Sequence, residues 1–346
     1  MLLVGLLAAA LWFGGGYLGA PRQVRLILLG LLFVAVMGIQ VGFPDGHPMR
    51  MATGQSPAFW LIVAGFVGIF LGYRELLRRL RARVPAEDVP PARTGTFSDT
   101  ELNRYARHIV LREIGGAGQK ALKEAKVLVI GAGGLGAPAL QYLAAAGVGT
   151  IGVIDHDTVD NSNLQRQVIH PDAHIGMPKV FSAQKQMIAL NPFVTVKPYH
   201  RRLTEEVAED LIAEFDLVLD GTDNFDTRYL VNRACVAAGK PLVSGALSQW
   251  EGQLSVFAPS RGGPCYQCIF PQAPAAHLAP SCAEVGVIGP LPGVIGSMMA
   301  VEAIKLITGA GTPAIGQMSI YDALYGESRS IGLERRSNCP ICGETS

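Results

Sequence analysis

A glycine-rich run in the middle of the sequence has the pattern of a phosphate-binding turn. The apolar segment Lys126–Ile130 predicts a short strand and leads directly into GAGGLG at 131–136; a second strand, Thr150–Ile154, ends at Asp155. Glycines in such a turn let backbone amides approach a phosphate at a helix N-terminus, and the acid can bind a ribose hydroxyl. The glycines are Gly131, Gly133, Gly134 and Gly136. The unit predicts nucleotide binding, and by itself it fits NAD as readily as ATP.

The loop after Asp155 distinguishes this sequence from a dehydrogenase. Its acidic, amide and cationic side chains are Asp157, Asn163, Gln165, Arg166 and, further on, Lys179. Positive groups near a triphosphate stabilise the charge that develops in phosphoryl or nucleotidyl transfer, whereas hydride transfer does not need them. The alternative interpretation is that Arg166 and Lys179 are ordinary solvated surface charges.

Four of the six cysteines form two CxxC pairs, Cys265 with Cys268 and Cys339 with Cys342. Paired thiolates suit tetrahedral zinc, and a closed four-cysteine site is structural rather than catalytic. Disulfides are the alternative, which a cytoplasmic location disfavours. Of the other two cysteines, Cys235 lies among Ala and Val in a helical run, which predicts a core position. Cys282 lies in a Pro- and Ala-rich loop and is a candidate reactive thiol.

The elements that must position these residues alternate between strand and helix. Asp216–Asp220 predicts a buried strand leading into GTDN at 221–224, and Pro241–Gly245 predicts another strand. This alternation implies an α/β fold with a Rossmann-like, doubly wound parallel sheet, whose ligands bind at the carboxyl ends of the strands. Asp223 is therefore expected at the same edge as Asp155.

The first 73 residues are far more apolar than the rest of the chain. Their charged side chains are Arg22, Arg25, Asp45 and Arg50, whereas charged residues make up 16% of the whole sequence. Uncharged runs cover Met1–Ala20, Leu26–Phe43 and Ala58–Tyr73. Because roughly 20 helical residues cross a bilayer core, the first two runs qualify as transmembrane helices and the third is marginal. A buried helical hairpin of a soluble protein is the alternative.

The distribution of arginines predicts the topology of these helices. Arginines lie between the first and second runs and again after the third, over 74–83. The positive-inside rule places both groups in the cytoplasm. We therefore expect a multi-pass cell-membrane protein with a transmembrane region over 1–73, a basic juxtamembrane helix and Pro-rich linker over 74–98, and a cytoplasmic catalytic domain over 99–346.

Composition excludes other classes. A net charge of +1 gives no support to nucleic-acid binding. With 49% hydrophobic residues the chain cannot be disordered, and six cysteines in 346 residues are too few for a disulfide scaffold.

Several motifs occur in a fixed order along the sequence. They are RYARHIVLREIG (104–115), GAGGLG (131–136), SNLQRQ (162–167), GMPK (176–179), GTDN (221–224) and the two CxxC pairs. Together they resemble the ThiF/MoeB/HesA family of E1-like activating enzymes. The resemblance covers about Asp99–Gly343 and leaves the apolar N-terminal region unexplained.

The resemblance implies ATP-dependent adenylation of the C-terminal glycine of a ubiquitin-like sulfur carrier, for molybdopterin or thiamine sulfur transfer. The cofactors implied are ATP, Mg²⁺ and Zn²⁺. The nucleotide-binding residues implied are Gly131, Gly133, Gly134, Gly136, Asp155, Asp157, Ser162, Asn163, Leu164, Gln165, Arg166, Lys179, Asp223 and Asn224. Within this set Asp155 binds the ribose, and Asp223 places Mg²⁺. Gly134 faces the phosphates, and Asn163 and Arg166 hold the triphosphate together with Lys179.

Two further residues have roles only through the resemblance. Arg107 is similar to an arginine that reaches into the partner subunit's site, which implies a homodimer. Cys282 matches a cysteine that in some members takes up the activated carrier covalently. Three alternatives stay open: a membrane-tethered NAD-dependent oxidoreductase, a catalytically idle membrane scaffold for a β-grasp partner, and a tRNA-modifying member of the same family.

Overall fold

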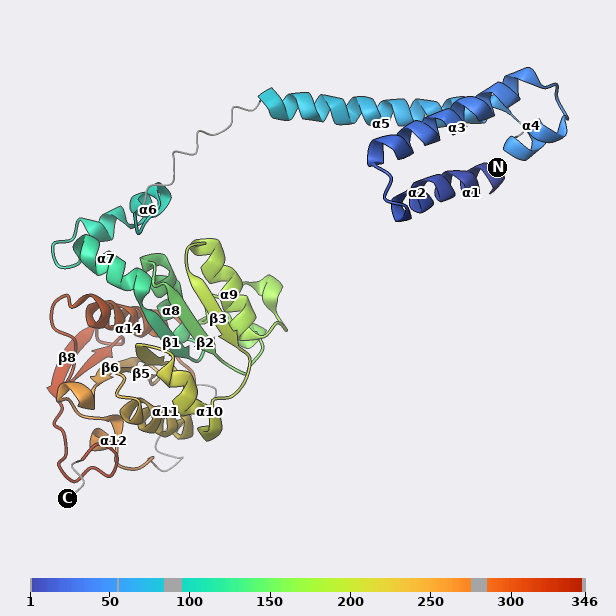
Figure 1. Ribbon diagram of the computed structural model, residues 1–346. Coiled ribbons are helices and arrows are strands. Elements are labelled where there is room, and N and C mark those ends of the chain that lie inside the picture. The colour runs from blue at the N-terminus through green and yellow to red at the C-terminus, as the bar shows by residue number, and fades with distance from the viewer. Residues whose placement is uncertain (1, 55, 84–94, 275–284, 344–346) are drawn as a thin grey trace. The chain divides into compact units, whose positions relative to one another are not determined.

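The chain divides into two compact units, Met1–Ala92 and Arg93–Ser346. A computed structural model describes residues 2–54, 56–83, 95–274 and 285–343 (Figure 1). The candidate thiol Cys282 therefore lies outside the described residues.

The first unit is helical throughout its described residues, apart from short turns. Its elements are α1 (Leu2–Ala9), η1 (Ala10–Gly14), α2 (Gly15–Tyr17), α3 (Arg22–Gly42), α4 (Pro48–Thr53) and α5 (Pro57–Arg83). The first three form one continuous helix over 2–17, because η1 is a single π-helical turn within it. At 1.5 Å per residue this helix is about 24 Å long, shorter than a typical bilayer core of about 30 Å. In contrast, α3 has 21 residues and reaches about 31 Å.

Three stretches of the described chain are long and apolar enough to cross a membrane, judged by length and composition alone: Arg22–Gly42, Pro48–Arg79 and Pro290–Thr308. The first of these stretches covers the second uncharged run of the sequence except for Phe43, and the second stretch contains the third run. Leu3–Tyr17, within the first run, is an apolar helix below this length. Pro290–Thr308 is α14 of the second unit and is half buried there.

Polar contacts join α3, α4 and α5 at one end of the first unit. The side chain of Gln40 is almost fully buried, and its Nε2 donates to Thr53 Oγ1 at 2.8 Å. Trp60 Nε1 donates to the carbonyl oxygen of Thr53 at 3.0 Å, and Arg50 pairs with Asp45 at 2.6 Å. Because buried donors without acceptors are costly, these bonds fix how the three helices meet.

The second unit is built on one sheet of eight strands in the order β3-β2-β1-β4-β5-β6-β7-β8. The strands are β1 (Lys126–Ile130), β2 (Thr150–Ile154), β3 (Thr195–Tyr199), β4 (Leu217–Asp220), β5 (Leu242–Leu247), β6 (Glu251–Phe257), β7 (Gln317–Asp322) and β8 (Glu327–Gly332). The first five pair in parallel, and β5 to β8 pair antiparallel. The parallel half has the crossover pattern of a Rossmann-like fold, as the sequence predicted.

The antiparallel half of the sheet lies beyond the strands that the sequence predicted. β6 follows β5 after three residues, a connection that allows only an antiparallel hairpin. The sequence pattern does not predict β7 and β8 as strands, because QMSIYD and ESRSIG are largely polar. All residues of β8 are exposed.

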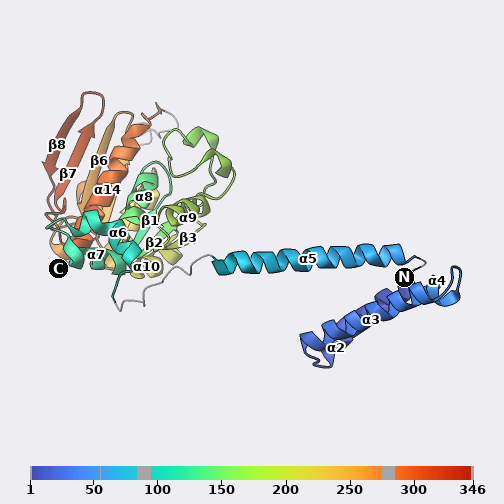
Figure 2. The ribbon, with the colours of Figure 1, turned by 90° about the horizontal axis from the view of Figure 1, so that it is seen from above.

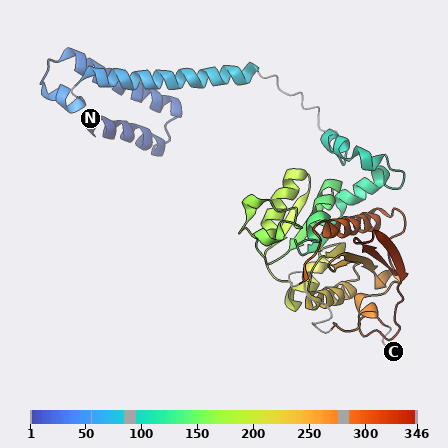
Figure 3. The same cartoon turned by 180° about the vertical axis from the view of Figure 1, so that it is seen from behind.

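Helices cover both faces of the sheet (Figures 2 and 3). They are α6 (Asp99–Ile109), α7 (Gly115–Glu124), α8 (Gly136–Ala146), α9 (Lys179–Leu190), α10 (Glu205–Ala213), α11 (Phe225–Ala237), α12 (Tyr266–Ile269) and α14 (Pro290–Thr308), with short 3-10 turns η2 (Asn161–Asn163), η3 (Asp172–His174) and η4 (Pro259–Arg261). Alternate residues of β1 enter two cores. Val127 and Val129 pack with α7, α8, α9 and α14, whereas Leu128 and Ile130 pack with α10 and α11. The central parallel strand β1 is therefore buried on both faces, whereas the edge strand β3 is partly exposed.

Candidate active site

A cleft of about 1550 Å³ lies at the carboxyl ends of β1, β2 and β4. Nine of the predicted nucleotide-binding residues line it: Gly131, Gly133, Gly134, Asp155, Asp157, Arg166, Lys179, Asp223 and Asn224. The other predicted residues, Gly136, Ser162, Asn163, Leu164 and Gln165, do not line it. The structure thus brings most of the predicted set to one site, as expected from the convergence of parallel strand ends.

Two glycines of the turn after β1 are required by its geometry. Gly131 has φ +90°, a conformation that other residues rarely adopt. A Cβ on Gly136 would lie 1.9 Å from the carbonyl oxygen of Gly131, so only glycine lets α8 start this close to the turn. Gly136 therefore allows α8 to pack closely against the turn, and this packing leaves the turn open toward the cleft.

Asp155 fixes the turn from the end of β2. Its carboxylate accepts 2.8 Å hydrogen bonds from the backbone amides of Ala132 and Asp157, one on each oxygen. Each oxygen has a second lone pair, so the carboxylate can still accept a hydroxyl donor from the cleft.

Lys179 is buried at the first position of α9 and faces the cleft. Its Nζ donates to Asp157 Oδ2 at 2.9 Å, and its backbone amide donates to the carbonyl of the same residue at the same distance. Burial raises the pKa of Asp157, but the hydrogen bond and charge of Lys179 outweigh it and leave that pKa below its usual value. The lysine and the aspartate are thus a fixed pair, and the interpretation of Lys179 as a loose surface charge is wrong.

Arg166 is held by the loop that precedes it. Its guanidinium donates to Asn163 Oδ1 at 2.8 Å and to the carbonyl oxygen of Ser162 at 3.3 Å. Its Cγ lies 3.7 Å from the place where a Cβ on Gly134 would stand. Asn163 and Ser162 therefore act on the cleft by orienting Arg166.

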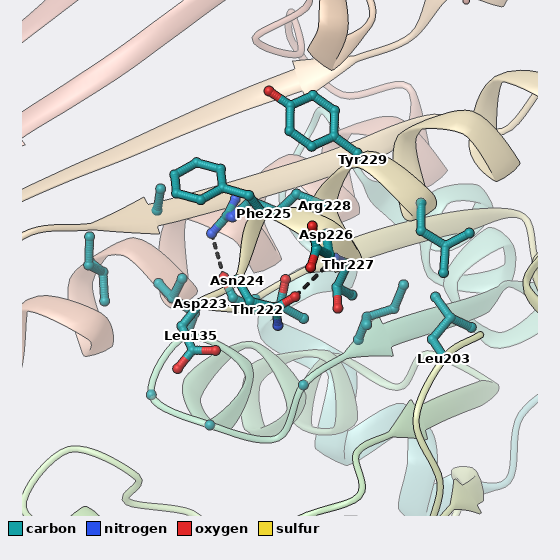
Figure 4. Close-up of a pocket in the computed structure, with 18 of the residues that line it drawn as sticks. Leu135, Leu203, Thr222, Asp223, Asn224, Phe225, Asp226, Thr227, Arg228 and Tyr229 are labelled. Atoms are coloured by element: carbon teal, nitrogen blue, oxygen red, sulfur yellow. Dashed lines mark hydrogen bonds between the residues drawn. The ribbon is translucent and has the colours of Figure 1, made fainter. Parts of the chain in front are cut away.

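Asp223 and Asn224 occupy the loop between β4 and α11 (Figure 4). Asp223 is exposed, and Figure 4 shows it directed toward the glycine turn. The side chain of Asn224 accepts from the backbone amide of Thr227 at 2.9 Å and caps α11. The structure thus gives Asn224 a capping role at the cleft edge.

A buried pair beneath this loop was missed by the sequence reasoning. Arg228 Nη1 lies 3.5 Å from Asp220 Oδ2, and both side chains are buried. Asp220 also accepts from the amide and hydroxyl of Thr222, and Arg228 donates to the carbonyl oxygens of Thr222 and Gly245. The pair holds the loop that carries Asp223. One sequence offers no signal for it beyond an acid at the end of a strand.

Two more arginines at the cleft were also missed. Arg201 and Arg202 follow β3 and line the cleft, and Arg202 lowers the pKa of Asp157 further. Arg107, on α6, is exposed and is not among the residues that line this cleft.

The four cysteines of the CxxC pairs form one buried cluster. The distances between sulfur atoms are 3.8 Å for Cys265–Cys268, 3.6 Å for Cys265–Cys339 and 3.4 Å for Cys268–Cys342. Tetrahedral zinc with bonds of about 2.3 Å separates its sulfur ligands by about 3.8 Å, so the donor set fits this ion. None of the described cysteines is in a disulfide.

The protonation of these thiols differs with their surroundings. Burial raises the pKa of Cys339, but the backbone amides of Cys342 and Ile341 outweigh it and lower that pKa to about 6. Burial raises the pKa of Cys265. Outside the cluster, Cys235 is buried in α11 as predicted, and burial raises its pKa as well.

Comparison with known proteins agrees with this geometry. Residues 105–341 match the ThiF family model. The chain is 50% identical over 252 residues to the sulfur carrier protein adenylyltransferase of Thermus thermophilus, covering 72% of this chain and 93% of that one. It is 51% identical over 255 residues to the probable adenylyltransferase/sulfurtransferase MoeZ of Mycobacterium tuberculosis, covering 73% of this chain but only 64% of that one.

Solved structures show the same fold. A crystal structure of E. coli MccB with ATP superposes with a TM-score of 0.62 at 23% identity, covering 71% of this chain and 75% of that chain. The sequence motifs, the cleft and the family match agree, and this chain belongs to the ThiF family.

Proposed function

We propose that this chain is an adenylyltransferase that uses ATP to activate the C-terminal glycine of a ubiquitin-like sulfur carrier. The observation that carries the proposal is the cleft itself: a phosphate-binding turn, the buried Lys179 and the oriented Arg166 converge on one space. The high identity to a sulfur carrier protein adenylyltransferase over nearly its whole length supports the same activity.

The chemistry assigned to the cleft is in-line transfer of a nucleotidyl group. The carrier carboxylate attacks the α-phosphorus of ATP, a new oxygen–phosphorus bond forms, and pyrophosphate leaves. Backbone amides of the turn contact the phosphates, and Asp155 accepts from the ribose. Arg166 and Lys179 stabilise the charge that develops on the phosphates, which is usually the largest contribution to such catalysis. Mg²⁺ bound near Asp223 would neutralise part of the triphosphate charge.

The cysteine cluster is proposed to hold structural Zn²⁺. Cys265 and Cys268 flank the start of α12, whose Tyr266 lines the cleft, while Cys339 and Cys342 belong to the C-terminal segment. A metal bound by all four would tie the C-terminal segment to the wall of the cleft and add its binding free energy to folding.

A homodimer is proposed because Arg107 does not line the cleft of its own chain. Reaching the cleft of a second copy would give this exposed arginine a contact with the triphosphate. Cys282 keeps the role of a candidate covalent acceptor of the activated carrier.

The first unit is proposed to anchor the enzyme in the cell membrane. Large apolar side chains of α3 and α5 are widely exposed, among them Leu31, Val34, Phe66 and Ile69. Water disfavours such surfaces, and a bilayer accommodates them. With α3 and α5 as an antiparallel pair of spans, Arg22 and the arginines after Tyr73 lie on one side, which the positive-inside rule makes cytoplasmic.

The test is ATP–pyrophosphate exchange by the purified full chain, with a panel of small carriers that end in Gly-Gly. Exchange that depends on one carrier is expected, and it would identify the pathway. Absence of exchange with every carrier tested, despite bound ATP, would contradict the proposal and favour an idle scaffold. Exchange that requires tRNA instead would point to the tRNA-modifying branch.

A further inference from the structure

The residue Ala132 of the phosphate-binding turn is held at both ends by side chains from other elements. Its amide donates to Asp155 Oδ2 at 2.8 Å. Its carbonyl oxygen lies 2.9 Å from His170 Nε2. Ala132 itself is fully buried, so neither backbone group can exchange its partner for water. The orientation of the turn therefore depends on His170 as well as on Asp155.

His170 is in turn fixed by α9, the helix that begins with Lys179. His170 Nδ1 lies 2.9 Å from Ser182 Oγ, and His174 Nδ1 lies at the same distance from that hydroxyl. Ser182 is fully buried and His170 almost so. Lys179 and Ser182 are three residues apart on α9 and share one face of it. The first turn of this helix thus supports both the lysine and the histidine.

The chemistry of these groups sets the position of each proton. A carbonyl oxygen can only accept, so Nε2 of His170 carries a hydrogen. In the neutral ring, Nδ1 then accepts from the Ser182 hydroxyl. The oxygen of Ser182 is left to accept from the Nδ1–H of His174. Each donor in this series of hydrogen bonds has one acceptor. The donors follow one another from His174 to Ser182, from Ser182 to His170, and from His170 to the carbonyl of the turn.

We infer that His170 is a positioning residue, which with Ser182 orients the phosphate-binding turn relative to Lys179. The role differs from that of Asp155, because His170 holds the carbonyl and leaves the amides of the turn free to face the cleft. Losing the donor would leave a buried carbonyl without a partner, and the turn would relax away from its present geometry.

The experiment compares four variants of the full chain in detergent micelles. His170→Phe removes the donor and keeps an aromatic ring. His170→Gln replaces it with an amide that can reach the same carbonyl. Ser182→Ala removes the group that orients the ring. Gln184→Ala is the matched control on α9, because it removes a bond from that helix to the carbonyl of Val196 in β3 and touches nothing at the turn.

We expect the dissociation constant for ATP to rise about tenfold in His170→Phe, as for the loss of one buried hydrogen bond. It should rise about threefold in Ser182→Ala and stay near the wild-type value in His170→Gln and Gln184→Ala. In exchange assays, KM for ATP should rise in His170→Phe while KM for the carrier does not. ATP affinity unchanged in His170→Phe would overturn the inference, as would His170→Gln binding as weakly as His170→Phe.

The inference rests on the proposed function only in taking ATP as the ligand. If the wild-type chain binds ATP but catalyses no exchange, the proposed function fails and the dissociation constants still decide the role of His170. If the wild-type chain binds no ATP, both are wrong. If His170→Phe does not fold, the contrast between His170→Gln and Ser182→Ala carries the test, and equal affinities in these two overturn the inference.

Discussion

Two helices of this protein, α3 and α14, are both long and apolar enough to cross a membrane, yet they differ in how much of each is buried. Only 11% of the apolar window of α3 is buried, against 50% of that of α14. Ile295 of α14 is fully buried, whereas Leu31 of α3 is 60% exposed. Apolar length alone therefore does not distinguish a membrane helix from a core helix.

The physical difference lies in what each helix packs against. Ile295 fills the space above two strand glycines: a Cβ on Gly252 would lie 2.3 Å from its Cγ1, and one on Gly245 would lie 3.3 Å from its Cγ2. On the helix itself, a Cβ on Gly296 would lie 2.3 Å from the carbonyl oxygen of Leu135. In the first unit the corresponding approach to α3 is made by a flexible side chain: a Cβ on Gly16 would lie 2.9 Å from Arg25 Nη1.

The largest predicted effect is a difference in stability between an aspartate substitution in α14 and one in α3. Ile295→Asp places an unpaired charge in a dry core and should cost about 4 kcal/mol or more, enough to unfold the second unit. Leu31→Asp should leave the second unit folded and reduce membrane insertion. Thermal unfolding and membrane fractionation measure the two outcomes. Val301→Asp, on the exposed face of α14, is the control; the comparison fails if it is as harmful as Ile295→Asp.

The next effect concerns the cysteine cluster, which belongs to the second unit alone. Cys339→Ala should lose zinc and destabilise this unit by about 2–5 kcal/mol, because binding of a structural metal contributes to folding. Metal analysis and urea unfolding measure both. Cys235→Ala, at a buried cysteine that is not one of the four clustered thiols, should keep the metal. Full stability in Cys339→Ala would contradict a structural role.

A change in the cleft should alter the rate without altering either unit. Lys179→Ala should lower the exchange rate about 10²–10³-fold, as for one preorganised charge near a reacting phosphate. Membrane insertion and thermal stability should stay close to the wild-type values. Lys185→Ala, exposed on the same helix, is the control and should keep the full rate. Equal rates in the two variants would remove Lys179 from the proposed mechanism.

The smallest effect is a pH dependence confined to the second unit. Burial lowers the pKa of His170, and Lys179 and His174 lower it further, while the carbonyl of Ala132 and the charge of Asp155 raise it. The unfolded chain therefore binds the proton at a higher pH than the folded chain. Stability from this group is complete above about pH 6.5 and declines as the pH falls below it, by at most about 1.4 kcal/mol per pH unit.

Urea unfolding at a series of pH values measures this slope. His170→Gln should remove that contribution, and membrane insertion should show no such dependence. A slope that persists in His170→Gln would assign the effect to another group.

Local patterns in the sequence determined much of this protein. Strand periodicity and the glycine run located β1 and β2 to the residue, and spacing alone indicated that the four cysteines share one site. These features are encoded within short stretches, so one sequence is enough to see them. The same holds for the apolar N-terminal region, whose first helix is shorter over its described residues than α3.

The tertiary structure decided what depends on residues far apart in the chain. Arg228 contacts Asp220 and Gly245 only once the strands have paired. The same is true of the contacts of His170 with Ala132 and Ser182. The burial of α14 likewise depends on glycines of β5 and β6 that lie more than forty residues before Ile295, the residue that packs on them. No local pattern encodes such contacts, because burial and hydrogen bonding are properties of the assembled sheet rather than of any one segment.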